Sequence, residues 1–474
     1  MLAIDHIQAL SEIDHCRTIA AHDDIKKFCI PERGNEIGKT PLVLMPSTTE
    51  AVSAILSYCH QHQLEIMPQG GLTGLAGGSI PTASDTQIVL NLSRLNQMIQ
   101  LKDGYATAQA GMVLSTFKDE VARKGRYFPL SYGSEQSAQL GGAVATNAGG
   151  INFLHYGGAR QLLLKLKVVL MDGTILELGN TVPKDNCGYD IKDLFVGSEG
   201  TLGVITEVTF RLFNPRAQTY TSLVGLTEIE PLPQIFKQLK SGMGDSLTAF
   251  ELINRQAFQL GFESYIKDHG DLALFDQSYP WYLLFECSTS SPYMNLQEML
   301  ILTLEADHSF INLEQVLLAE NLEKAEALWS CRHRISDAAK HYPGITFDIS
   351  VEDIDGFVKE FSTKITAIHS QLVPVIFGHA GDYNLHVHAR NMSSKQDLSA
   401  LEKQQLEDLV FAILTSMKEK KLGASLSAEH GIGRHKKRML SSWVPQVHIQ
   451  AMKGIKQLFD PQSLLHDGVI FDKD

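Results

Sequence analysis

Residues 377–388 concentrate histidines in a pattern that suits metal binding or proton transfer. The segment reads as strand, bend and strand, and Asn384, His386 and His388 share one face of the second strand because side chains alternate along a strand. His379 stands where the first strand enters the bend, so it can approach His386 across the hairpin. Two imidazoles that meet in this way need only one or two carboxylate oxygens to complete a divalent-metal site.

Glu429 and His430 could supply the groups that the hairpin lacks. Gly431 and Gly433 allow the chain to turn, so that the two adjacent side chains can serve one pocket. The alternative is that the paired histidines only satisfy hydrogen bonds and that Glu429 begins a helix. On the residues alone this alternative is the commoner outcome, and the pattern by itself leaves the metal site open.

Four glycine-rich segments indicate a site for a large cofactor: residues 68–78, 133–150, 157–158 and 197–203. Glycine permits positive φ and close backbone approach, and successive backbone N–H groups can form a concave nest for a pyrophosphate. Tight turns could explain any one cluster. However, glycine pairs beside the small-residue run 143–148 would form a smooth wall for a flat ring. No cluster is GxGxxG, so the Rossmann fingerprint is absent, and flavin is the cofactor that fits.

The elements that must position these groups follow from the pattern of apolar residues. Residues 1–40 read as one or two helices. Residues 42–62 read as a short strand and a helix opened by a capping box, and a further strand leads into the first glycine cluster. The next stretch, 86–212, is rich in strand signals, whereas 216–420 mixes amphipathic helices with strands. This order predicts an α+β protein with a second domain built around an antiparallel sheet.

Composition narrows the class of protein. A chain of 474 residues with 44% hydrophobic and 20% charged residues suits two or three globular domains. A net charge of −13 argues against nonspecific nucleic-acid binding. The six cysteines form no CxxC pair, the first 20 residues lack the apolar run of a signal peptide, and no stretch is apolar enough to span a membrane. We therefore expect a cytoplasmic protein without a transmembrane segment.

Segments 68–78, 129–150 and 184–206 resemble the vanillyl-alcohol-oxidase-type (PCMH-type) FAD domain, and more narrowly the FAD-linked D-2-hydroxyacid dehydrogenases. The resemblance extends over nearly the whole chain. It implies a two-subdomain FAD-binding domain in residues 1–215, which includes the helical segment at the amino terminus. It also implies an α+β substrate (cap) domain with an antiparallel sheet in residues 216–474, whose tail returns toward the flavin.

The resemblance assigns FAD binding to residues of the glycine-rich loops and of the strand that follows them. They are Pro68, Gln69, Gly70, Gly71, Leu72, Thr73, Gly74, Gly77, Gly78, Pro129, Leu130, Gly133, Ser134, Ser137, Gly141, Gly142, Ala145, Thr146, Gly149, Gly150, Glu199, Gly203 and Ile205.

The same family binds a divalent ion through two histidines and a glutamate, and the histidine after the glutamate is its base. The resemblance therefore assigns His379, His386 and Glu429 as ligands, with zinc as the expected metal and manganese or cobalt as alternatives. It assigns His430 as the base.

The stretch 329–335 resembles the family's arginine-bearing helix, and it assigns the substrate carboxylate to Arg332. Either Arg332 or Arg334 could equally be a surface charge. Asn384 and His388 complete the expected substrate contacts.

Several positions depart from the family pattern. Tyr383 replaces a glycine in the hairpin bend, and residues 466–468 replace an Asn-Pro-Gly near the end of the chain. A lysine that would pair with a second substrate carboxylate is missing, because Thr346 and Phe347 occupy its place. The last change weakens the case for 2-hydroxyglutarate and leaves the substrate's side chain open.

The expected reaction is oxidation of a small D-2-hydroxy acid to the 2-oxo acid, with hydride transfer to flavin N5. Expected electron acceptors are an electron-transfer flavoprotein or a quinone, and a homodimer is possible. Two alternatives remain from the sequence: a glycolate- or D-lactate-type oxidase that uses oxygen, and a non-catalytic flavin-binding subunit.

Overall fold

The computed structural model describes residues 2–31, 36–182, 184–270, 278–306 and 310–472. Its contacts divide the chain into two compact units. The first unit comprises Met1–Gly149, Gly157–Pro215 and Glu429–Asp474, and the second comprises Gly150–Tyr156 and Arg216–Ala428. The sequence predicts a second domain of residues 216–474 whose tail returns toward the flavin, and in the structure the segment from Glu429 onward packs with the first unit.

A four-stranded sheet organises the amino-terminal part of the first unit. Its order is β1 (Cys16–Ile19), β2 (Val43–Pro46), β4 (Ile88–Asn91) and β3 (Ile66–Gln69). Strand β1 is antiparallel to β2, and the other pairs are parallel. Residues 16–19 thus form a strand within a segment whose pattern suggested helices. The helical parts of that segment are α1 (Ile4–Ser11), α2 (His22–Ile25) and the 3-10 turn η1 (Lys26–Phe28).

Helix α3 (Thr49–Gln61), which the sequence predicted from its capping pattern, packs on this sheet, and its cap is Thr48. The Thr48 hydroxyl accepts a hydrogen bond from the amide of Ala51, which satisfies one of the free N–H groups of the first turn. Val52, Ile55 and Leu56 of the helix belong to one buried cluster with residues of β2, β3 and β4. This packing holds β3 in place, and the first glycine loop begins where that strand ends.

The second sheet of the first unit has five antiparallel strands. Its order is β5 (Met98–Leu101), β6 (Tyr105–Gln109), β9 (Val204–Arg211), β7 (Leu163–Val169) and β8 (Ile175–Gly179). The helices of this region are α4 (Leu114–Arg123), α5 (Leu140–Ala145), α7 (Ala159–Leu162) and α8 (Lys192–Phe195).

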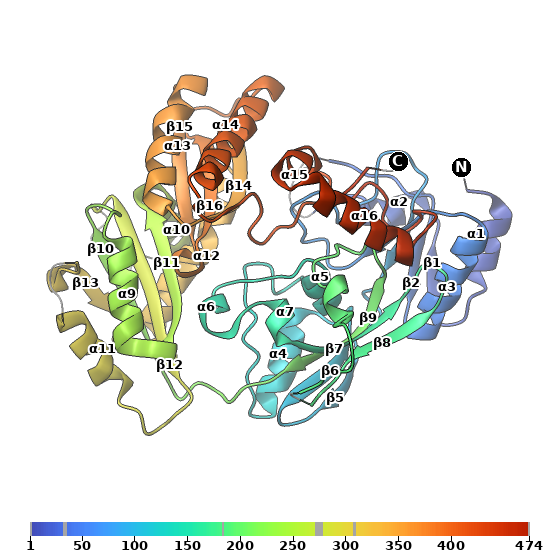
Figure 1. The fold of residues 1–474 in the computed structure, drawn as a ribbon, viewed down its shortest axis with the longest axis horizontal. Coiled ribbons are helices and arrows are strands. Elements are labelled where there is room, and N and C mark those ends of the chain that lie inside the picture. The colour runs from blue at the N-terminus through green and yellow to red at the C-terminus, as the bar shows by residue number, and fades with distance from the viewer. Residues whose placement is uncertain (1, 32–35, 183, 271–277, 307–309, 473–474) are drawn as a thin grey trace. The chain divides into compact units, whose positions relative to one another are not determined.

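Figure 1 shows the carboxyl-terminal helices α15 (Lys437–Trp443) and α16 (Gln446–Phe459), and the ring of Phe459 at the end of α16 lies 5.3 Å from that of Phe195 in α8. After α16 the chain runs along β3, where the amide of His466 donates to the carbonyl of Ile66 at 2.7 Å.

The second unit is built on an eight-stranded sheet in which every pair is antiparallel, as the sequence predicted. Its order is β13 (Val316–Leu318), β10 (Gln218–Leu226), β12 (Trp281–Thr289), β11 (Leu247–Asn254), β15 (Leu372–Gly378), β16 (Asn384–Asn391), β14 (Gly344–Val351) and β17 (Ala424–Ser425). Three 3-10 turns, η2 (Gly244–Ser246), η3 (Leu313–Gln315) and η4 (Ala380–Asp382), interrupt its connections.

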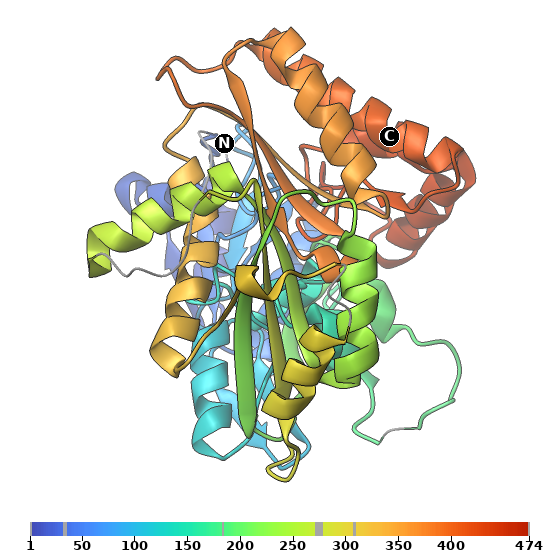
Figure 2. The same cartoon turned by 90° about the vertical axis from the view of Figure 1, so that its left-hand side faces the viewer.

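Helices cover both faces of this sheet. On one face α10 (Arg255–His269) and α12 (Leu322–Ala339) pack on Ile253 of β11, and on the other Phe236 of α9 (Leu232–Met243) packs on Phe250 of the same strand. Figure 2 shows the α10–α12 pair and the pair of α9 and α11 (Leu296–Glu305) on opposite sides of the strands. Helices α13 (Ile354–Ile368) and α14 (Ala400–Glu419) contact β15 and β14, and the short α6 (Phe153–Tyr156) contacts β11.

Across the described residues, no helix is both long enough and apolar enough to cross a membrane.

Candidate active site

The histidine segment forms the predicted hairpin, with β15 and β16 joined by η4. Phe377 pairs with His386 across the hairpin. Gly378 is required at the turn, because a Cβ there would lie 2.4 Å from the carbonyl oxygen of Asn384. Tyr383, which stands where the family pattern has glycine, adopts a left-handed φ of 67°. This conformation costs an L-residue roughly 1–2 kcal/mol, so packing elsewhere must hold the bend in place.

The hairpin brings the imidazoles of His379 and His386 together. Their ring centroids are 5.7 Å apart, and one nitrogen of each ring lies within 4.8 Å of the other. Asp348 on β14, which the sequence analysis missed, is completely enclosed and lies 3.8 Å from Nδ1 of His386. The amide of Asn384 donates to the same carboxylate at 2.9 Å. Two imidazoles at this separation can bind one divalent cation if further oxygen ligands are supplied.

A buried glutamate, also missed by the sequence analysis, orients this cluster. The carboxylate of Glu251 on β11 accepts hydrogen bonds from Nδ1 of His379 and from Nε of Arg332, the latter at 2.6 Å. Burial alone would raise the pKa of Glu251, but Arg332 and His379 together hold that pKa well below its ordinary value. The available signal was a lone acidic residue within the apolar run of residues 247–254.

The structure separates the two candidate arginines of α12. The guanidinium of Arg332 is buried and lies 4.5 Å from the centroid of the Phe377 ring, which itself lies 5.2 Å from the ring of His386. Arg334 is two residues on, so it points to the other side of the helix, where it pairs with Asp268 at 2.5 Å. Only Arg332 therefore lies beside the hairpin histidines.

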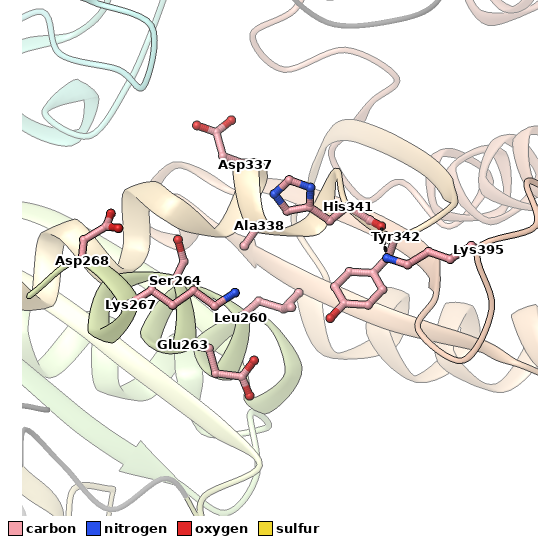
Figure 3. Close-up of a pocket in the computed structure, with 10 residues that line it drawn as sticks. All are labelled: Leu260, Glu263, Ser264, Lys267, Asp268, Asp337, Ala338, His341, Tyr342 and Lys395. Atoms are coloured by element: carbon pink, nitrogen blue, oxygen red, sulfur yellow. Dashed lines mark hydrogen bonds between the residues drawn. The ribbon is translucent and has the colours of Figure 1, made fainter. Parts of the chain in front are cut away.

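A hollow of about 370 Å³ is lined by Ser264 and Asp268, two residues of α10 that Arg334 contacts, and Figure 3 shows its lining residues. Its lining comes from α10, from the end of α12, from His341 and Tyr342 and from Lys395, and it includes charges of both signs. None of the residues assigned to catalysis, metal binding or FAD binding lines this hollow. We therefore do not assign the chemistry to it.

Glu429 and His430 begin the last segment of the first unit, and their turn is fixed by Glu199. The carboxylate of Glu199 accepts hydrogen bonds from the amides of Ile432 and Gly433, each at 2.8 Å. Burial raises the pKa of Glu199, and the two amides partly oppose this effect. Glu199 was assigned to FAD binding from the sequence, and in the structure its carboxylate is occupied by the backbone of this turn.

The predicted FAD loops lie together in the first unit. A Cβ on Gly71 would lie 2.0 Å from the carbonyl oxygen of Ser137, so the first and second loops touch backbone to backbone. His466 joins the first loop to the fourth: its ring nitrogens lie 2.7 Å from the carbonyl oxygen of Glu199 and 2.9 Å from that of Gly78. Burial lowers the pKa of His466 to about 4, although these two carbonyls oppose the shift.

Not every predicted glycine has the same role. A Cβ on Gly141 would lie 2.7 Å from Cβ of Ala110, and one on Gly203 would lie 2.5 Å from Val168, so these two glycines serve packing. A Cβ on Gly133 or Gly142 would meet no atom within 4 Å. A bound flavin nucleotide could lie against the backbone in the open space beside these two glycines.

Other predicted FAD residues have structural partners or lie elsewhere. The amide of Gln69 donates to the carbonyls of Phe28 and Ser79, and Ile205 is buried in β9. Gly149 belongs to the first unit, whereas Gly150 begins the short segment of the second unit.

Comparison with known proteins identifies both units. Residues 40–179 match the FAD binding domain, and residues 215–470 match the C-terminal domain of FAD linked oxidases. The D-2-hydroxyglutarate dehydrogenase of Rattus norvegicus is 35% identical over 90% of this chain and 78% of its own length. The bacterial enzyme of the same name from Xanthomonas citri is 31% identical over 91% of this chain and 89% of its own.

The fold is also that of solved flavoenzymes. The structure of p-cresol methylhydroxylase superposes with a TM-score of 0.74, at 14% identity, over 99% of this chain and 97% of that one. These matches confirm the two-subdomain FAD fold and the family that the glycine segments and the histidine hairpin indicated. The chain therefore belongs to the FAD-linked D-2-hydroxyacid dehydrogenase family and is an FAD-dependent oxidoreductase.

Proposed function

We propose that this protein oxidises a D-2-hydroxy acid to the 2-oxo acid, with D-2-hydroxyglutarate as the first substrate to test. The observation that carries the proposal is the cluster in which Glu251 joins His379 to Arg332, with the ring of His386 beside that of His379. It offers imidazole ligands and a bidentate cation for a carboxylate, in a chain 35% identical to a protein named for that reaction.

Each residue of the proposed site has one role. His379 and His386 hold a divalent cation together with Glu429, and zinc is the ion that this donor set suits best. Arg332 binds the substrate carboxylate, and Asn384 and His388 line its surroundings. His430 removes the hydroxyl proton, a task for which an imidazole is well matched near neutral pH. When bound, FAD supplies the hydride acceptor at N5, and the cation supplies Lewis-acid polarisation of the hydroxyl group.

Glu251 fixes the ring of His379 for this role. A hydrogen bond from Nδ1 to a carboxylate selects the tautomer whose Nε2 carries the lone pair, and metal-binding histidines are usually oriented by such a bond.

The test is the visible flavin spectrum of purified, oxygen-free protein before and after addition of D-2-hydroxyglutarate, followed by D-lactate. Bleaching by either D-acid, and not by its L-enantiomer, supports the proposal. Protein that contains flavin and is bleached by neither acid would exclude the proposed reaction. Treatment with a chelator should abolish bleaching without releasing FAD, and restoration by zinc, manganese or cobalt would identify the metal.

The same experiment separates the alternatives. Reoxidation by air at the rate of turnover would favour an oxidase, whereas slow reoxidation favours transfer to an electron-transfer flavoprotein or a quinone. A non-catalytic flavin subunit would not bleach. Homodimer formation and a cytoplasmic location stay predictions from the sequence.

A further inference from the structure

A buried guanidinium lies on the strand that carries the hairpin histidines. Asn384, His386, His388 and Arg390 alternate along β16, so all four face the same side of the sheet. Arg390 is only 8% exposed. Its Nη2 donates to the hydroxyl of Thr346 at 2.6 Å and lies 3.1 Å from Nδ1 of His388.

The partners of Arg390 do not neutralise its charge. Besides Thr346 and His388, it has the backbone carbonyl of Tyr342, reached by Nη1 at 3.4 Å. Its Nε is buried and has no hydrogen-bond acceptor among the residues that the structure describes. Buried charges in proteins are as a rule paired, because removing an ion from water is costly. A buried guanidinium with only neutral partners is a group that can bind an anion.

No carboxylate of the described residues forms an ion pair with Arg390. The carboxylate of Asp397 attracts the guanidinium of Arg390 electrostatically but forms no ion pair with it. That carboxylate is paired with Lys403 at 2.7 Å. Burial accordingly lowers the pKa of Arg390 to about 10, although the side chain stays charged at neutral pH.

The position of this guanidinium suits the far end of a short substrate. Two residues along a strand are about 7 Å apart, which is the spacing of His386 and His388 along β16. The guanidinium of Arg390 lies beside the ring of His388, so it too is about 7 Å from His386 along the strand. The ring of Phe377 spans both, with centroids 5.2 Å from His386 and 5.3 Å from His388. An extended small dicarboxylate covers a comparable distance, and Thr346 is exposed, so a ligand can approach the guanidinium there.

We propose that Arg390, with the Thr346 hydroxyl and His388, binds the second carboxylate of a dicarboxylic 2-hydroxy acid. The inference rests on the proposed function, whose reaction would take place at the His379–His386 end. It makes the protein selective for a dicarboxylate over a monocarboxylate of the same length.

The experiment compares D-2-hydroxyglutarate with D-2-hydroxyvalerate, in which a methyl group replaces the distal carboxylate. In the wild-type holoenzyme, kcat/KM should favour the dicarboxylate. Arg390→Met should raise KM for D-2-hydroxyglutarate by about 10- to 100-fold, the usual worth of a hydrogen bond to a charged group, with little change in kcat. KM for D-2-hydroxyvalerate should change by less than about twofold.

Two further variants keep the test decisive if Arg390→Met folds poorly. Arg390→Lys should recover part of the affinity, and Thr346→Val, at an exposed position, should raise KM for the dicarboxylate alone by a few-fold. Lys395→Met, a cation of the loop after β16, is the control and should affect neither substrate.

The outcomes separate the two proposals. If the wild type oxidises D-2-hydroxyvalerate as well as D-2-hydroxyglutarate, the reaction stands and the Arg390 subsite is wrong. If Arg390→Met impairs both substrates equally, Arg390 only braces β14 against β16, and the inference fails. If neither acid reduces the flavin, the proposed function itself fails.

Discussion

The carboxylate of Glu251 accepts a hydrogen bond from Nε of Arg332 at 2.6 Å, and both side chains are buried in the second unit. The other oxygen of the same carboxylate accepts from His379. One acidic side chain thus orients a proposed metal ligand and a proposed substrate-binding cation. With Nε engaged, the terminal nitrogens of Arg332 are the ones available to a substrate carboxylate.

Glu251→Gln should lower the free energy of unfolding at neutral pH by about 3 kcal/mol, because it leaves a buried guanidinium without its counter-charge. The pKa of Glu251 is depressed in the folded protein, so its contribution is complete above the ordinary glutamate pKa of 4.5. It is lost as pH falls below that value. The difference in unfolding free energy between wild type and variant, measured on the apoprotein in urea, should therefore shrink from pH 7 to pH 4. A difference that did not change with pH would show that Glu251 is not ionised.

Arg332→Lys should raise KM for the 2-hydroxy acid by about 10- to 100-fold, since an ammonium group cannot form the bidentate pair with a carboxylate. The matched control is Arg334→Lys on the same helix, whose guanidinium pairs with Asp268 at the partly exposed face. Steady-state kinetics of that variant should stay within about twofold of wild type, because exposed ion pairs contribute little. Equal effects of the two substitutions would contradict the assignment of Arg332.

His430→Ala should slow substrate-driven flavin reduction by about 100-fold or more, the usual contribution of a general base, and leave FAD bound. Stopped-flow absorbance of the flavin under anaerobic conditions measures this rate. Added imidazole should restore part of it. His448→Ala, on the exposed side of α16, is the control and should reduce its flavin at the wild-type rate. Normal reduction in His430→Ala would mean that another group takes the proton.

Local patterns were sufficient to predict the hairpin. Strand periodicity placed His386 and His388 on one face, and the turn residues placed His379 at its end, because these relationships depend only on neighbours along the chain. The cap of α3 at Thr48 was likewise local. The resemblance chose Arg332 over Arg334, but the helical pattern alone could not, since both arginines suit a helix and only packing decides which one faces the sheet.

Relationships between distant segments could not be predicted. Glu251 reaches His379 because β11 pairs with β15, a register that joins Leu252 to Gly378 and that no local pattern encodes. The contact of Glu199 with the amide of Ile432 spans 233 residues. Residues 16–19 became a strand through pairing with β2 rather than through their own propensity.

The predicted contact between FAD and α5 can be tested with one substitution and a matched control. Gly142 lies within α5, and a Cβ there would meet no protein atom within 4 Å. Gly142→Ala should therefore leave the protein's own packing intact and stabilise the apoprotein by about 0.5–1 kcal/mol, the gain expected when alanine replaces glycine in a helix. If FAD lies against this helix, the added methyl group should at the same time weaken FAD binding by about tenfold or more.

Gly454→Ala in α16 is the matched control, because a Cβ there also meets no atom within 4 Å and the gain in helix stability should be similar. Its flavin content, measured as flavin absorbance per protein after gel filtration, should equal that of the wild type. If the cofactor fills the open space beside Gly142, the Gly142→Ala apoprotein becomes more stable while its flavin content falls. Gly454→Ala should show the gain in stability without the loss of flavin. Full flavin content in Gly142→Ala would place FAD away from α5, and Gly133, another predicted contact beside open space, would be the next position to substitute.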